Sequence, residues 1–220
     1  MTTITPRFQG PHQGQPVLQA GAPLATAKAA MILLHGRGAT AQDILTLVPE
    51  LNQPEFAYFA PQASENTWYP YSFLAPISQN EPGISSGLQA ISDVLRQLSE
   101  NGFPPERVML LGFSQGGCLT LEFAARHAQR FGGVVGLSAG LIGPEGTPRE
   151  YSGSFDGTPI FLGCSDNDVH IPSARFNDTA LVLGKLNAQV TTRLYPDFGH
   201  AIHSDEIRFV QQMMHALVKK

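Results

Sequence analysis

The sequence predicts an α/β fold with a mostly parallel, doubly wound sheet and helices on both of its faces. Several short segments are apolar at every position, as expected of strands buried between two helical layers, and Ala29–Leu34 (A-A-M-I-L-L) is the clearest. Segments with helical spacing, such as Ile84–Asn101, separate these strands and imply right-handed crossovers between parallel strands. We find no internal repeat and no linker, so residues 1–220 are expected to form a single domain.

Composition and charge narrow the classes of function. The 14 Lys and Arg against 18 Asp and Glu give a net charge of −4 without a basic cluster, so no nucleic-acid partner is expected. No apolar run approaches the roughly 18 residues of a membrane span, and Met1–Gly14 lacks the apolar region of a signal peptide. Cys118 and Cys164 fit neither a disulfide framework nor a metal-binding spacing. We therefore expect a cytoplasmic protein with reduced thiols, no metal and a loosely ordered segment 1–14.

The first half of the chain is expected to contain three strands and two helices. Thr40 is a good helix cap, and Asn101-Gly102 is a common helix end. The expected elements are, in order, an edge strand Gln15–Ala20, the strand Ala29–Leu34, a helix Ala41–Leu51, a short strand Phe56–Ala60 and a helix Ile84–Asn101.

Residues 62–82 show no periodicity and are expected to form a long loop. Loops of this length inside a compact domain are often functional. The loop carries a group of apolar and aromatic side chains, Trp68, Tyr69, Phe73 and Leu74. We expect these four residues to line an apolar pocket for an acyl or aryl group; the alternative is that they only pack the loop onto the domain.

The second half continues the alternation of strand and helix. Gly133–Leu137 and Pro159–Gly163 read as buried strands, and residues 139–158 as a loose, turn-rich segment. The other expected elements are a strand Val108–Leu111, a helix Gly117–Gln129, a helix from Pro172 to about Asn187, a strand Val190–Tyr195 nearer the sheet edge, and a final helix capped by Ser204.

Ser114 lies in the motif G-x-S-x-G between a predicted strand and a predicted helix. This is the pattern of a nucleophile elbow, in which a sharp turn holds the serine clear of the surrounding backbone. Glycines two residues before and after the serine avoid a collision with neighbouring backbone. The N-terminal amides of the following helix favour negative charge at this point. The motif therefore predicts Ser114 as a catalytic nucleophile.

An acid and a histidine follow the serine in later loops, each at the expected carboxyl end of a strand. The chain order serine, acid, histidine is that of the α/β type of hydrolase and differs from that of chymotrypsin or subtilisin. A serine hydroxyl needs a neutral imidazole to accept its proton, and a buried carboxylate fixes the tautomer of that imidazole. The order thus predicts a Ser-His-Asp triad.

His200 is the favoured base among seven histidines because it follows Gly199 in a loop just after the last strand. His203 is the main rival, and a role at the start of the final helix is its alternative. The other five are assigned to bracing, packing or surface positions, or have no supporting context: His12, His35, His127, His170 and His215.

Asp168 is the favoured acid because it lies four residues before Pro172, which opens the next helix. Asp166, in the same loop, is a second candidate that would otherwise shape a turn. Asp197 is a third, and would otherwise cap the turn that presents His200.

The oxyanion formed during acyl transfer needs two hydrogen-bond donors. The backbone N–H of Gln115, which follows the nucleophile, is expected to be one of them. Arg37, in the loop after Ala29–Leu34, is best placed to give the second backbone N–H. The Arg37 side chain could contact an anionic substrate, but a solvated position is favoured.

Five motifs together resemble the phospholipase/carboxylesterase family of α/β-hydrolases, which includes the acyl-protein thioesterases. They are L-H-G-R-G, A-P-Q-A followed by T-W-Y, G-F-S-Q-G-G, D-x-x-I-P and F-G-H, and the similarity runs from about Ala29 to the end. The resemblance implies an α/β-hydrolase fold. It maps the nucleophile, acid and base onto Ser114, Asp168 and His200, the oxyanion amides onto Arg37 and Gln115, and a family tryptophan onto Trp68.

The expected activity is hydrolysis of small to medium carboxylic esters, or thioesters, through an acyl-enzyme and without a cofactor. The segment T-W-Y-P-Y-S-F-L-A-P (67–76) departs from the thioesterase-like pattern and favours a small carboxylesterase of bacterial type. No long helical insertion follows Leu137, so no large lid is expected and short esters should be preferred.

Three other functions remain open at this stage. The first is an acyl-protein thioesterase or lysophospholipase that acts on longer acyl chains. The second is a dienelactone-hydrolase-like enzyme, a family with a cysteine nucleophile where this chain has Ser114. The third is a non-catalytic binding module. A homodimer is implied only by the family resemblance.

Overall fold

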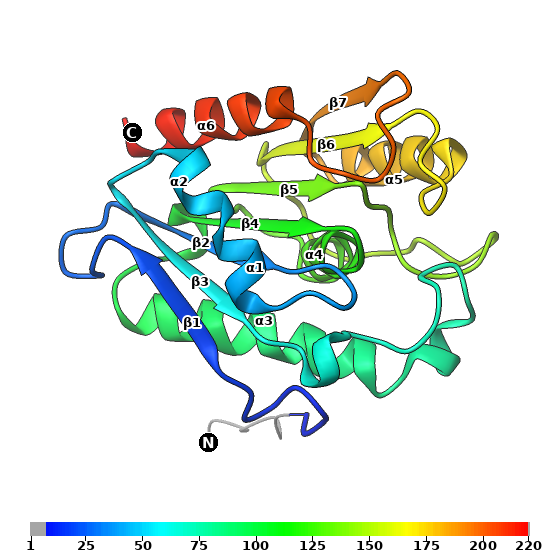
Figure 1. Cartoon of the computed structure of the whole chain (residues 1–220), viewed down its shortest axis with the longest axis horizontal. Helices are drawn as coiled ribbons and strands as arrows, with labels where there is room; N and C mark the ends of the chain where they lie inside the picture. Colours follow the sequence, from blue (N-terminus) through cyan, green and yellow to red (C-terminus); the bar gives the residue numbers. More distant parts are fainter. Residues whose placement is uncertain (1–7, 220) are drawn as a thin grey trace.

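A seven-stranded sheet with the strand order β1-β3-β2-β4-β5-β6-β7 forms the centre of the molecule (Figure 1). The computed structural model describes residues 8–219. Strand β1 pairs antiparallel with β3, and every other pairing in the sheet is parallel. The strands are β1 (Val17–Gly21), β2 (Ala29–Leu34), β3 (Phe56–Pro61), β4 (Val108–Phe113), β5 (Gly133–Leu137), β6 (Pro159–Ser165) and β7 (Gln189–Tyr195). The predicted α/β fold, with β1 and β7 at the edges, is confirmed.

Helices cover both faces of the sheet and define two apolar layers. Alternate residues of β2 contribute to the two layers: Ile32 packs on one side and Met31 on the other. One layer contains α3 (Gly83–Glu100), α4 (Gln115–Arg126) and α5 (Ser173–Lys185). The other contains α1 (Ala41–Leu45), α2 (Leu47–Leu51) and α6 (Ser204–Val218). None of the helices within residues 8–219 has the length and apolarity needed to cross a bilayer.

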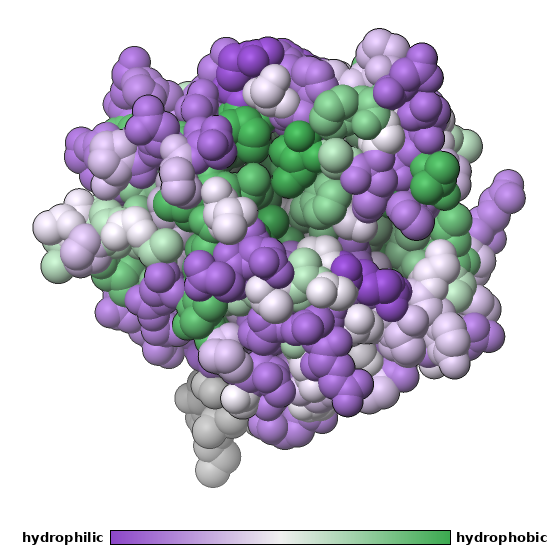
Figure 2. Space-filling view, in the orientation of Figure 1, coloured by the Kyte–Doolittle hydropathy of each residue, from purple (hydrophilic) through white to green (hydrophobic). Residues whose placement is uncertain are grey.

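The layer formed by α1, α2 and α6 contains fewer buried apolar side chains than the other. Figure 2 shows hydrophobic atoms at the surface between α6 and the pair α1–α2. Apolar side chains that are only partly buried pack against this layer, among them Leu47, Val48, Phe113, Ile202 and Ile207.

One predicted helix is two helices in the structure. Thr40 caps the first as expected: its hydroxyl accepts a hydrogen bond from the N–H of Asp43, whose carboxylate accepts one from the N–H of Thr40. The helix stops at Leu45, and α2 begins at Leu47. Pro49 explains the break, because proline has no N–H to donate to the carbonyl of Leu45 and its ring would press against that carbonyl.

Three other predicted helix starts are shifted. Helix α4 begins at Gln115, directly after Ser114, and so includes the turn that we expected to precede it. Pro172 is the N-cap residue of α5, and the first helical residue is Ser173. His203 caps α6, and the expected cap Ser204 is the first helical residue. The His203 imidazole accepts from the N–H of Asp205, which the hydroxyl of Ser204 does not do.

The part of segment 1–14 that the structure describes is packed, although looseness was expected for the whole segment. Residues 1–7 lie outside the described residues. His12 is buried; its N–H donates to the hydroxyl of Ser86, and its ring contacts Ser64 and Trp68 through hydrogen bonds. These contacts to distant residues were not visible in the local composition.

The carboxyl ends of the parallel strands lie at one edge of the sheet, at the right in Figure 1. The loops after β2, β4, β6 and β7 therefore meet there. The long loop after β3 contains two short 3₁₀ helices, η1 (Ser64–Asn66) and η2 (Ile77–Asn80), and a third, η3 (Pro105–Arg107), precedes β4. This edge holds the candidate site.

Candidate active site

Ser114 lies in a strained turn between β4 and α4, with φ 53° and ψ −121°. Two glycines make the turn feasible. A Cβ on Gly116 would lie 2.4 Å from the carbonyl oxygens of Leu34 and His35, and a Cβ on Gly112 would lie 2.3 Å from the carbonyl oxygen of Gly116. Real Cβ atoms essentially never approach backbone this closely, so the backbone of β2 and α4 fits together only with glycine. This geometry is that of a nucleophile elbow.

Ser114, His200 and Asp168 form a continuous hydrogen-bonded chain. The Ser114 Oγ lies 2.8 Å from His200 Nε2, and His200 Nδ1 lies 2.7 Å from Asp168 Oδ2. The three residues come from the loops after β4, β7 and β6, which the strand order brings to one edge. The structure thus brings together the three residues that the sequence predicted for nucleophile, base and acid.

Asp168 is 8% exposed, and donors surround its carboxylate. Its Oδ1 accepts from the N–H of His170 at 2.9 Å and from that of Ile171 at 3.2 Å. Its Oδ2 accepts from Cys164 Sγ at 3.6 Å in addition to the contact with His200. Burial raises the pKa of Asp168, but the hydrogen bonds from His200 and His170 outweigh burial, so the pKa lies below its usual range. Asp168 is therefore a carboxylate that is held ionised.

Ser165 positions the loop that carries His200, a role that sequence reasoning missed. Its hydroxyl accepts from the N–H of Phe198 at 3.1 Å and from that of Gly199 at 3.0 Å. Gly199 has φ +78°, which glycine adopts without strain. Ser165 is the last residue of β6, whereas the predicted strand ends at Gly163, so the sequence does not mark this role.

The two competing acids, Asp166 and Asp197, take no part in the hydrogen bonds that join Ser114, His200 and Asp168. The N–H of Asp197 donates to Asp166 Oδ1 at 3.1 Å, and Asn167 donates to Asp197 Oδ1 at 3.0 Å. Asp166 and Asp197 are both exposed. They shape the loop beside His200, which is the alternative role that the sequence left open for each.

His203 also has a structural place, as the cap of α6. His35 accepts from the N–H of Ala63 at 3.1 Å, and its carbonyl accepts from the indole N–H of Trp68 at 2.9 Å. His12 accepts from the N–H of Ser64 at 3.0 Å and contacts the carbonyl of Trp68 at 2.8 Å. These two buried imidazoles brace the long loop on either side of its tryptophan.

Two backbone N–H groups adjoin Ser114 without an acceptor. Among residues 8–219, neither the N–H of Arg37 nor that of Gln115 donates a hydrogen bond. The turn that carries Arg37 packs against the serine, since a Cβ on Gly36 would lie 3.5 Å from Ser114 Cβ. The N–H of Gln115 opens helix α4, whose dipole favours negative charge there.

A cavity of about 520 Å³ adjoins Ser114. Tyr69 and Phe73 line it, as predicted for the substrate pocket. Trp68 does not line it: the indole is 0% exposed and packs between His12 and His35. Leu74 does not line it either and packs against the apolar core. The lining consists of Arg37, Tyr69, Pro70, Tyr71, Ser72, Phe73, Ser114, Gln115, Cys118, His170, Ile171 and His200.

The side chains of Gln115 and Arg37 hold the wall of this cavity. Gln115 Nε2 donates to the carbonyl of Tyr69 at 2.7 Å, and its Oε1 accepts from the N–H of Trp68 at 2.9 Å. The Arg37 guanidinium donates to the carbonyls of Pro70 at 2.9 Å and Tyr71 at 2.6 Å. The sequence favours a solvated Arg37 side chain; the side chain is exposed, but these bonds fix it to the loop.

Cys118 lies one helical turn after Ser114 at the buried end of the cavity. Burial raises the pKa of its thiol to about 12, so the thiol stays protonated at neutral pH. A protonated thiol is a poor nucleophile. The geometry therefore favours Ser114 over a cysteine-based mechanism.

Comparison of the sequence with known proteins finds a matching family and several relatives. A model of the phospholipase/carboxylesterase family matches residues 17–218. Acyl-protein thioesterase 1 of Yarrowia lipolytica is 23% identical over 211 residues, which cover 87% of this chain and 93% of that protein. Acyl-protein thioesterase 1 of Gibberella zeae is 26% identical over 146 residues, which cover 62% of this chain and 59% of the fungal protein. This chain therefore matches less than two thirds of the length of that relative.

Solved structures show the same similarity. The phospholipase/carboxylesterase of Dyadobacter fermentans superposes with a TM-score of 0.88 at 40% identity, over 92% of this chain and 97% of that one. The carboxylesterase of Bacillus cereus has a TM-score of 0.72 at 16% identity, over 93% and 95% of the two chains, and shows the likeness of fold alone. With the sheet order and the family match, these similarities establish the α/β-hydrolase fold. The chain belongs to the phospholipase/carboxylesterase family.

Proposed function

We propose that this protein is a serine hydrolase that cleaves carboxylic esters, or thioesters, through an acyl-enzyme on Ser114. Family membership supports an ester or thioester hydrolase. The observation that carries the finer proposal is the chain of contacts from Ser114 Oγ through His200 to Asp168, at 2.8 and 2.7 Å. Such a chain is the arrangement that a serine needs to act as a nucleophile.

In the first half-reaction, Ser114 Oγ attacks the carbonyl carbon while its proton passes to His200 Nε2. The ionised Asp168 accepts the Nδ1–H of His200 and stabilises the imidazolium that forms. The negative oxygen of the tetrahedral intermediate accepts the N–H groups of Arg37 and Gln115. The bond to the alcohol or thiol then breaks, and His200 returns the proton to that leaving group.

In the second half-reaction, a water molecule attacks the acyl-enzyme as His200 takes one of its protons. The carboxylic acid product is released when its bond to Ser114 Oγ breaks and the His200 imidazolium returns the proton to the serine. The net reaction converts the ester and one water molecule into a carboxylic acid and an alcohol. The same two N–H groups hold the second oxyanion.

The cavity favours a compact acyl or aryl group. Its volume is about 520 Å³, and the buried side chains of Tyr69, Phe73 and Cys118 form part of its lining. Within the described chain, residues 139–158 contain no helix that could cover the site. An acyl-protein thioesterase or lysophospholipase activity would need a longer chain to extend into solvent, so short esters are the leading substrates.

The test combines a labelling experiment with an ester series. A fluorophosphonate probe should label the wild-type protein and leave Ser114→Ala unlabelled. Ester turnover should fall by about 10⁴-fold or more in Ser114→Ala, because the triad acts as a unit. Absence of labelling in the folded wild type would indicate a non-catalytic binding module. p-Nitrophenyl acetate and butyrate should be hydrolysed faster than palmitate or palmitoyl thioesters; the reverse order would favour a long-chain thioesterase.

A further inference from the structure

We propose that the mouth of the active-site cavity binds a carboxylate carried by the alcohol part of the substrate ester, with Arg37 and His170 as the specificity-determining residues. The inference rests on the proposed esterase function and adds a substrate class to it.

The charge of the lining is the first observation. Among the residues that line the cavity, Arg37 carries a permanent positive charge, His170 adds an imidazole, and none has a carboxylate. The chain as a whole has more acidic than basic residues, 18 Asp and Glu against 14 Lys and Arg. The basic character of this cavity is thus a local property, opposite in sign to the net charge.

The state of the Arg37 guanidinium is the second observation. The two carbonyls that fix it, those of Pro70 and Tyr71, are neutral acceptors, and its carbon lies 5.8 Å from the centre of the Tyr69 ring. Among residues 8–219, Arg37 takes part in no ion pair. The guanidinium is therefore a pre-positioned cation without a counter-charge, with N–H groups left for a planar anion such as a carboxylate.

His170 faces the same space from the opposite loop. Its N–H is held by Asp168 Oδ1 at 2.9 Å, and its ring packs edge-on against His200, with 4.7 Å between ring centres and an angle of 72°. Within the described part of the chain, no side-chain hydrogen bond involves the His170 ring. The ring is exposed and can donate an N–H to a group at the mouth.

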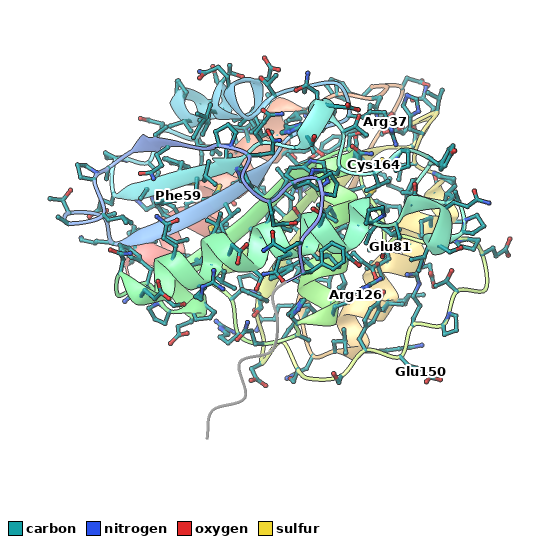
Figure 3. All side chains as sticks on the ribbon, turned by 90° about the horizontal axis from the view of Figure 1, so that it is seen from below. Arg37, Phe59, Glu81, Arg126, Glu150 and Cys164 are labelled. Atoms are coloured by element: carbon teal, nitrogen blue, oxygen red, sulfur yellow. The ribbon has the colours of Figure 1, made fainter. Side chains whose placement is uncertain are left out.

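The shape of the cavity assigns the anion to the alcohol part. Cys118 and Tyr69 at one end are buried, whereas Arg37, His170 and Tyr71 at the other are exposed, Tyr71 at 57%. Figure 3 labels Arg37 at the end of the sheet where the site lies. An acyl group that uses the buried apolar end leaves the alcohol part at the charged mouth. A carboxylate there keeps most of its hydration while it gains the charge-assisted contact.

The experiment compares two esters of equal size, 4-carboxyphenyl acetate and its neutral amide analogue 4-carbamoylphenyl acetate. The readout is the ratio of their kcat/KM values, each corrected for the spontaneous hydrolysis rate. The wild type should favour the carboxylate by about tenfold at low salt. This preference should shrink at high ionic strength because exposed charges are screened.

Variants of Arg37 and His170 test whether these residues cause the preference for the carboxylate ester. Arg37→Met should bring the ratio close to one, Arg37→Lys should keep part of it, and His170→Asn should reduce it. Because Arg37 also holds the loop, both rates are expected to fall in Arg37→Met, and the ratio cancels that common loss. Arg130→Met is the matched control: Arg130 likewise donates to a backbone carbonyl, that of Asp156, but does not line the cavity, so the ratio should not change.

Three outcomes would overturn the inference. A wild-type ratio of one with both esters hydrolysed would remove the anion site and leave the esterase function intact. A preference that survives in Arg37→Met would remove the role of Arg37. A preference seen only when the carboxylate is on the acyl side, tested with phenyl hydrogen adipate against its amide, would reverse the assignment to the alcohol. Hydrolysis of no ester at all would overturn the proposed function itself.

Discussion

Cys164 Sγ lies 3.6 Å from Asp168 Oδ2, the same oxygen that contacts His200. Burial raises the pKa of this thiol to about 12, so it remains protonated and can only donate to the carboxylate. A side chain near the end of β6 thus adds to the backbone donors around the acid.

Cys164→Ala should shift the acid limb of the kcat/KM profile to higher pH by roughly half a unit. The loss of one donor raises the pKa of Asp168 and strengthens its attraction for the imidazolium of His200. Cys164→Ser keeps a donor and should stay close to the wild-type profile. The measurement is ester hydrolysis from pH 5 to 9. Equal profiles for the alanine and serine variants would show that the thiol only fills space.

Gly116→Ala should be strongly destabilising and abolish turnover. The added Cβ would lie 2.4 Å from the carbonyl oxygens of Leu34, the last residue of β2, and His35, and backbone there cannot move without separating β2 from α4. We expect a loss of about 3 kcal/mol or more in the free energy of unfolding. Gly184→Ala is the matched control, because that helical glycine has no atom within 4 Å of the added Cβ; it should gain about 0.5–1 kcal/mol. Urea unfolding of both variants checks the contrast, which similar losses in the two would contradict.

Because of Glu206, part of the free energy of unfolding should decrease as the pH rises. Burial raises the pKa of Glu206 from 4.5 to about 7, and its Oε1 is buried against Gly163 without a hydrogen-bond donor. Between these two pKa values the folded protein holds a proton that the unfolded chain has released, so this group's contribution to stability falls as the pH rises.

Glu206→Gln should remove that dependence, since Gln can still accept the N–H of His203 in place of Oε2. Above pH 8 the variant should be more stable than the wild type by up to about 3 kcal/mol, and the difference should vanish near pH 4.5. Urea unfolding of the two proteins at pH 5 and pH 8 measures it. A difference that is the same at both pH values would mean that Glu206 is ionised in the folded state throughout.

His12 should contribute to stability at neutral pH and lose that contribution in acid. Burial lowers the pKa of His12 below 6.5, although its hydrogen bonds to backbone partly oppose this. Its Nδ1 accepts the N–H of Ser64, which only the neutral imidazole can do. Below about pH 6.5 the unfolded chain binds a proton that the folded protein excludes, so the contribution decreases as the pH falls.

His12→Ala should therefore lower the free energy of unfolding by about 1–3 kcal/mol at pH 7.5 and by less at pH 5. Trp68 is the only tryptophan and lies against His12, so its fluorescence follows unfolding at this site. His127→Ala, at an exposed position, serves as the control and should have a small effect at both pH values. An equal penalty at both pH values in His12→Ala would contradict the proposal that the folded protein excludes the proton.

The sequence could predict the features that local pattern determines. The buried strands were recognised from their apolar runs, and Ser114 from a motif whose glycines are fixed by close backbone contacts. His200 and Asp168 followed from their places after strands, because parallel strands bring such loops to one edge. The prediction of one helix over Ala41–Leu51 was wrong because Pro49 cannot donate the helical hydrogen bond to Leu45.

Contacts between distant segments could not be predicted from the sequence. Trp68 was expected in the pocket because an aromatic in a long loop has no local signal that separates lining from packing. Its burial depends on His12 and His35, which come from other parts of the chain. Likewise, Ser165 reaches Gly199 across 34 positions, and no pattern in the sequence marks that hydrogen bond.

Gln115 holds the cavity wall through the backbone of Trp68 and Tyr69, and Arg37 holds it through the carbonyls of Pro70 and Tyr71. These bonds hold the wall through its backbone and not through the exposed side chains that it presents. Substitutions at exposed wall positions can change which substrate is accepted while the reacting atoms stay in place. A single scaffold of this kind can acquire new specificities by one substitution at a time, and the same property makes the wall a practical starting point for engineering.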